Sequence, residues 1–98
     1  MAIAVDIGTM IVRTPGTVGG RPRIEGTRIA VDHIAVLRNH GYSPEEIVHT
    51  RYTHVSLAQV YAALAYYHAN KESIDASIAE EAELHDRLSG VVESPTPA

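Results

Sequence analysis

The chain has 98 residues, the size of a single domain. Hydrophobic residues make up 45%, and the only aromatic residues are five tyrosines, so the core must be largely aliphatic. The absence of cysteine excludes disulfides, thiolate zinc sites and cysteine nucleophiles. No apolar run approaches the ~20 residues of a membrane span, and Met1 to Thr9 lack the features of a signal peptide, so we expect a cytoplasmic protein without a membrane partner.

The net charge of −4 is unevenly distributed. Residues 1–70 carry six arginines and five acidic residues, a net charge of +1. Residues 71–98 carry seven acidic residues against Lys71 and Arg87, a net charge of −5. A near-neutral body with an acidic tail argues against nucleic-acid binding by the whole surface but leaves room for a local basic patch.

The first residues favour a short β-hairpin. Ile3–Val5 and Met10–Val12 have the composition of β-strands, and Gly8 and Thr9 between them indicate a turn.

Residues 14–28 contain six Gly or Pro residues, which predicts an irregular loop. Three arginines of this loop are candidates for contacts with DNA phosphates: Arg21, Arg23 and Arg28. The alternative is that they pair with neighbouring acidic residues and fix the loop, namely with Asp6, Glu25 or Asp32. The loop lacks the Gly-Lys-Ser/Thr ending of a phosphate-binding loop, so we expect no nucleotide site.

Three helices joined by short turns are predicted next. The first is expected over Ile29–His40, followed by a glycine that stops it. The second, much shorter, begins with Ser-Pro-Glu-Glu at Ser43, the pattern of a capping box, and ends near Thr50. The third begins at Ser56 with a second capping box.

The third helix has the clearest periodicity in the chain. Its spacing predicts a core face of Leu57, Val60, Tyr61, Leu64 and His68. Small residues on the other side permit close approach of a second helix, so we expect a homodimer interface of Ala58, Ala62, Ala63 and Tyr66. Gln59 is a weaker candidate for a DNA contact, because this helix has no Arg or Lys after Arg51 and is a poor reader of the major groove.

A fourth helix, solvated and with a thin apolar edge, is predicted over residues 72–88, and Ser94–Pro97 indicate a disordered end. An acidic helix of this shape suits a basic cleft, such as that of an RNA-cleaving enzyme. Six of its residues are candidates for that contact: Ile74, Ile78, Glu80, Glu81, Leu84 and Leu88.

Together these elements predict a mainly α fold: a trihelical helix-turn-helix core, preceded by a short β-hairpin and followed by a C-terminal extension helix. The hairpin and core are expected in residues 1–70, the acidic extension helix in residues 71–90, and a disordered tail in residues 91–98.

Neither catalysis nor metal binding is indicated by the polar residues. None of the six histidines has the His-x-x-x-His or His-Glu-x-x-His spacing that directs two imidazoles at one metal. No nucleophile, base and oxyanion set can be assembled from the motifs. We therefore expect no enzyme activity, no metal and no cofactor.

Three runs resemble the small bacterial domain family of unknown function numbered 433: residues 21–29, 41–47 and 60–67, in this order. The resemblance implies a helix-turn-helix-like fold and an antitoxin role, paired with a PIN-like ribonuclease toxin. It also implies dimerisation and binding of the complex to its own promoter. The turn at residues 51–55 lacks a proline common there, and the tail from Asn70 onward lies outside the shared core.

The leading hypothesis is therefore a type II antitoxin. It would neutralise a PIN-like ribonuclease through its acidic helix and bind operator DNA as a dimer. One alternative is a stand-alone helix-turn-helix transcription regulator, although acidic residues near DNA would repel phosphates. The other is an interaction module that binds no DNA, which the scarcity of basic residues on the third helix favours.

Overall fold

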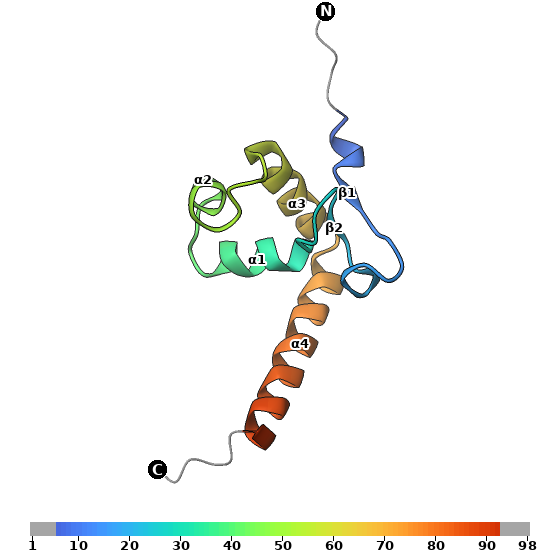
Figure 1. Cartoon of the computed structure of the whole chain (residues 1–98), viewed down its shortest axis with the longest axis vertical. Helices are drawn as coiled ribbons and strands as arrows, with labels where there is room; N and C mark the ends of the chain where they lie inside the picture. Colours follow the sequence, from blue (N-terminus) through green and yellow to red (C-terminus); the bar gives the residue numbers. More distant parts are fainter. Residues whose placement is uncertain (1–5, 93–98) are drawn as a thin grey trace, which may run out of the picture.

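A body of helices and a small sheet carries one long helix that projects away from it (Figure 1). The structure, a computed structural model, describes residues 6–92. Over these residues the fold is mainly α with a short antiparallel hairpin, as the sequence predicts. No helix in the described range combines the length and hydrophobicity needed to cross a membrane.

The hairpin joins β1 (Ile11–Val12) to β2 (Arg23–Ile24) in antiparallel register. The expected partner strand Ile3–Val5 lies outside the described residues, and Ile7–Thr9 form a 3-10 turn, η1. The prediction of an irregular loop is wrong at β2. Its Ile24 is fully buried and pairs with Ile11, and the apolar side chain draws this segment into the core.

Between the two strands the chain makes a second 3-10 turn, η2 (Val18–Gly20). The backbone is left-handed at three successive residues, with φ of 43° at Val18, 67° at Gly19 and 77° at Gly20. Glycine adopts such angles at little cost, whereas a β-branched residue does so rarely. The left-handed backbone angle at Val18 is unfavourable by itself, so contacts made by neighbouring residues must stabilise it.

The helical body consists of α1 (Val31–Asn39), α2 (Pro44–Glu46) and α3 (Leu57–Ala69). Between α2 and α3 the chain forms a π-helical turn, η3 (Ile47–Arg51). The predicted second helix, expected to run from Ser43 to about Thr50, therefore changes from α-helical to π-helical geometry at Ile47.

Both predicted capping boxes are confirmed. The Ser43 hydroxyl accepts from the Glu46 N–H (3.1 Å), and the Ser43 N–H donates to the Glu46 carboxylate (2.8 Å). Ser56 and Gln59 make the same reciprocal pair at the start of α3. These side chains satisfy helix N–H groups that have no partner within the helix, and they fix where α2 and α3 begin.

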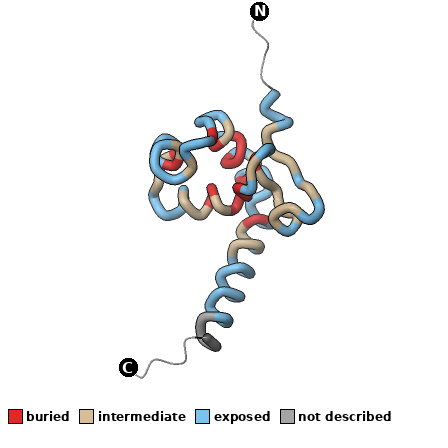
Figure 2. The backbone as a smooth tube through the Cα atoms, in the orientation of Figure 1, coloured by how far each residue is buried: buried red, intermediate tan, exposed pale blue. Residues whose placement is uncertain are grey.

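The core lies where α3 packs against α1 and against the hairpin, and Figure 2 shows the buried residues gathered in this part of the body. Its largest fully buried side chains are Ile24, Val31, Ile34, Ile47 and Val60.

The buried face of α3 differs from the predicted one. Its buried residues are Val60, Ala62, Ala63, Leu64 and Tyr67, of which Val60 and Leu64 were predicted to be buried. Three residues expected to be buried are exposed: Leu57, Tyr61 and His68. Two overlapping stripes of the helix have apolar members, and only the one that faces α1 is covered.

After Asn70 the chain turns into α4 (Lys71–Val92), which continues past Gly90, where its end was predicted. Ile74 belongs to the core at 5% exposure, and Ile78 packs partly against the core. From residue 79 onward the described side chains are exposed (Figure 2). The helix therefore has an anchored first part and a projecting second part.

Replacing Leu64 and Leu57 separately by alanine tests the observed face of α3. Leu64 is buried and Leu57 is 37% exposed, although both are leucines of the same helix. We expect Leu64→Ala to lower the free energy of unfolding by ~2–5 kcal/mol, because it leaves a cavity, and Leu57→Ala to lower it by less than ~1 kcal/mol. Urea denaturation measures both, and equal losses would contradict the assignment.

Candidate partner-binding helix and its anchor

The elbow between α3 and α4 is held by three polar side chains. The Tyr67 hydroxyl donates to one Asp75 oxygen (2.6 Å), and the Lys71 ammonium group donates to the other (2.8 Å). The same ammonium group lies 5.5 Å from the centre of the Tyr67 ring. The hydrogen bond from Lys71, followed by that from Tyr67, lowers the pKa of Asp75, and Asp75 in turn raises the pKa of Lys71.

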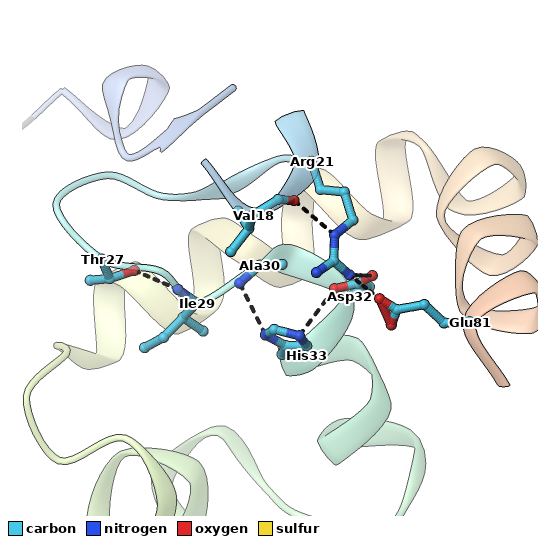
Figure 3. A network of polar contacts seen from close by, with 8 residues as sticks. All are labelled: Val18, Arg21, Thr27, Ile29, Ala30, Asp32, His33 and Glu81. Atoms are coloured by element: carbon cyan, nitrogen blue, oxygen red, sulfur yellow. Dashed lines mark hydrogen bonds and ion pairs between the residues drawn. The ribbon is translucent and has the colours of Figure 1, made fainter. Parts of the chain in front are cut away.

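Arg21 connects α4 to the body at Glu81, ten residues after the start of the helix at Lys71 (Figure 3). The Arg21 guanidinium donates to Asp32 on α1 (2.7 Å) and to Glu81 on α4 (2.5 Å). Its Nε donates to the carbonyl of Val18 (3.0 Å), inside the left-handed turn. Arg21 belongs to the loop of residues 14–28, called here the Gly-rich loop. Its side chain thus links α1, α4 and the strained turn η2.

Asp32 is the buried member of this network, at 6% exposure. Its Oδ2 is bound by Arg21, while Oδ1 lies 3.9 Å from Nε2 of His33 (Figure 3). Nδ1 of His33 accepts a hydrogen bond from the Ala30 N–H (3.2 Å). A buried carboxylate is costly unless paired, so Arg21 compensates a charge that α1 would otherwise leave isolated.

Most of the predicted DNA contacts are used within the chain. Arg21 pairs with Asp32, which was the structural alternative for the loop arginines. Arg23 is half-buried and donates to the Thr27 carbonyl and the Thr14 hydroxyl. Gln59 closes the capping box of α3. Arg28 is the exposed member of the predicted set, whereas the other three are half-buried.

The predicted partner-binding residues of α4 fall into two groups. Ile74 is buried in the chain's own core, Ile78 is half-buried, and Glu81, although exposed, pairs with Arg21, so this part of the predicted solvated helix contacts the body. The other three are exposed: Glu80, Leu84 and Leu88. The surface available to a partner therefore begins at Glu80, six residues or nearly two turns later along the helix than the predicted start at Ile74.

The predicted dimer surface also changes. Ala62 and Ala63, expected on an outer face of α3, are only 6% and 0% exposed because the chain itself covers them. Ala58 is exposed and Tyr66 is half-buried. Homodimerisation stays a prediction, and an interface on α3 would have to use its exposed residues.

Two features of this region had no signal in the sequence that identified them. The pairing of Arg21 with Glu81 spans 60 positions. The contact of Tyr67 with Asp75 joins residues eight positions apart on two different helices, a pairing that helical periodicity does not indicate. Within residues 6–92, no group of three or more His, Asp or Glu side chains is arranged to hold a metal ion.

Comparison with known proteins gives one family and one solved structure. A family model described as "Protein of unknown function (DUF433)" matches residues 11–67. The chain is similar to the crystal structure of a DUF433 member protein from Anabaena variabilis ATCC 29413, with 36% sequence identity and a TM-score of 0.65. That alignment covers 71% of this chain and 68% of the other. No curated protein matches the chain.

Removing the Arg21 side chain should cost more stability than removing the charge of Glu81. Arg21→Ala leaves the buried Asp32 carboxylate without its cation, whereas Glu81→Gln breaks an exposed pair. We expect Arg21→Ala to lower the free energy of unfolding by roughly 1–3 kcal/mol. We expect Glu81→Gln to lower it by at most about 1 kcal/mol. Urea denaturation of both variants measures this. A larger loss for Glu81→Gln would contradict the claim that the pair of Arg21 with the buried Asp32 is the more stabilising one.

The elbow should make stability depend on pH. Because the folded pKa of Asp75 is lowered from its ordinary value of 3.8, its contribution is fully present above that value. The contribution is lost as pH falls through the lowered folded pKa. Asp75→Asn should therefore be less stable than the parent near neutral pH, and the difference should vanish in acid. Denaturation of the parent and of Asp75→Asn across pH tests this, and a difference that stays constant into acid would contradict the role given to the elbow.

Proposed function

Since the chain belongs to the DUF433 family of proteins of unknown function, and the matched region ends before α4, we propose that α4 carries the activity particular to this protein. That activity is antitoxin-like: the projecting part of α4 binds a protein partner and blocks it. The body holds the helix in place, and the partner receives its outer turns.

The observation that carries the proposal is the exposure of two leucines on the projecting part. Leu84 and Leu88 are 48% and 57% exposed and lie one turn apart on the helix. Glu80 lies one turn before Leu84, so an acidic group flanks the apolar pair. An amphipathic helix of this kind binds by laying its apolar side into a groove of a partner.

The charge of this segment indicates the chemistry of the partner. Glu80, Glu83 and Asp86 are exposed there, and Arg87 is the one Lys or Arg between residues 80 and 88. Arg87 lies 3.7 Å from Glu83, so part of its charge is compensated locally. A groove that complements this helix carries basic groups, as does the cleft of a nuclease that holds RNA. A PIN-like ribonuclease, the toxin class that the family resemblance implies, fits this description.

The anchored first part of α4 favours such binding. Ile74 and the Arg21–Glu81 pair already order the helix before a partner arrives, so less conformational entropy is lost on binding. An antitoxin whose inhibitory helix is held by its own body is thus preorganised. An interaction module without antitoxin activity would share this geometry. The two differ in the effect of binding: an antitoxin blocks its partner's activity, whereas an interaction module would leave that activity unchanged.

Co-expression with the protein encoded by the neighbouring reading frame tests the proposal, scored by co-purification and by recovery of growth. We expect the parent chain to do both. Leu84→Ala/Leu88→Ala should weaken capture by more than about tenfold, because burial of each leucine contributes roughly 1.5–3 kcal/mol. Leu57→Ala, a leucine exposed on the body, is the matched control and should retain capture.

Two outcomes would contradict the proposal. Undiminished rescue by the double variant would remove α4 as the binding element. Capture without any recovery of growth would favour the interaction module over the antitoxin.

A further inference from the structure

The turn that joins α2 to α3 gathers aromatic and cationic side chains away from α4. It comprises η3 and the residues that follow it, and it lies across the body from the Gly-rich loop (Figure 1). Four aromatic or basic residues of this turn are exposed or half-buried, and Tyr42, from the turn before α2, contacts one of them. These five residues are called here the π-turn surface: Tyr42, His49, Arg51, Tyr52 and His54. π-helical turns are rare and occur frequently at functional sites.

Arg51 is the centre of this surface. Its guanidinium carbon lies 4.9 Å from the centre of the Tyr42 ring, and its Nη2 donates to the Tyr42 hydroxyl (2.5 Å). Tyr42 and Tyr52 pack partly against the core, so the rings have fixed positions. Arg51 therefore presents a positive charge that is held in place while it stays exposed.

The charge of Arg51 is not compensated by an acidic partner. No ion pair to a carboxylate forms at Arg51 among the described residues. The sequence from residue 47 to residue 71 contains no Asp or Glu. The nearest acidic residues in the chain are Glu45 and Glu46, and the Glu46 carboxylate accepts from the Ser43 N–H. The Arg21 and Lys71 cations, by contrast, are both paired with carboxylates.

An edge-on aromatic pair lies in the same turn. The rings of Tyr52 and His54 are 6.4 Å apart at 86°, and His54 is exposed. Nucleic acids are bound without sequence preference by positive groups that contact phosphates and by aromatic rings on which bases stack. The π-turn surface has both kinds of group within four consecutive residues, from Arg51 to His54.

We propose that the π-turn surface is a nucleic-acid site, with Arg51 contacting the phosphate backbone and His54 contributing an aromatic contact. This assignment is independent of the partner-binding role of α4. It places the nucleic-acid contact away from the loop arginines, two of which bind groups of their own chain. An acidic protein segment is the competing ligand, but it would need only the charge and would gain little from the rings.

The test is fluorescence anisotropy with a labelled mixed-sequence DNA single strand and the matching duplex, titrated with the full chain over a range of salt concentrations. We expect salt-dependent binding to at least one of the two probes. Arg51→Ala should weaken it roughly five- to tenfold and lower the slope of log K against log salt by about 1. His54→Ala should weaken it by a smaller factor at all salt concentrations.

Arg28→Ala and Arg87→Ala are the matched controls, because each removes an exposed arginine from another part of the chain. Both should leave the affinity within about twofold of the parent, since neither residue lies in the π-turn surface that the proposal assigns to the phosphate contact. Absence of binding to both probes would overturn the proposal. So would an Arg28→Ala loss as large as that of Arg51→Ala, or equal binding of polyglutamate with the same dependence on Arg51.

Discussion

The Arg21 guanidinium group is the contact on which the shape of the molecule depends. It binds the Val18 carbonyl in the Gly-rich loop, the buried Asp32 carboxylate of α1 and the Glu81 carboxylate of α4. Helix α4 has 22 residues, a length of ~33 Å at 1.5 Å per residue, so a small change of angle at its start moves its far end by a large distance. The elbow contacts of Asp75 hold the start of the helix, and Arg21 fixes its direction at Glu81, six residues later.

The structure separates charges of opposite sign. The projecting part of α4 is acidic, whereas the π-turn surface carries an arginine without a carboxylate partner, on a different side of the body (Figure 1). Exposed charges further apart than the Debye length of ~8 Å at physiological salt are largely screened from each other. The acidic helix therefore need not oppose the approach of a phosphate backbone to Arg51. The two proposed ligands, a basic protein and a nucleic acid, are opposite in charge and can therefore bind different parts of the same small chain.

Local signals in the sequence predicted the local parts of the fold. The capping boxes at Ser43 and Ser56 depend on residues three positions apart, and both are present. The face of α3 was predicted less well, because Leu57 and Tyr61 belong to a stripe that overlaps the buried one, and only the packing of α1 decides between them. The anchoring of Ile74 and the pairing of Arg21 with Glu81 depend on contacts distant in sequence, which periodicity does not encode. The same holds for the pairing of β2 with β1.

The central claim is that α4 has an anchored first part and a projecting second part that is available to a partner. Amide hydrogen exchange resolved by residue measures this directly in the protein alone. Our account predicts slow exchange from the second turn of α4 to about Glu81 and markedly faster exchange over residues 82–88, because only the first part is covered by the body. Uniform protection along the whole helix, or equally fast exchange over both parts, would contradict it.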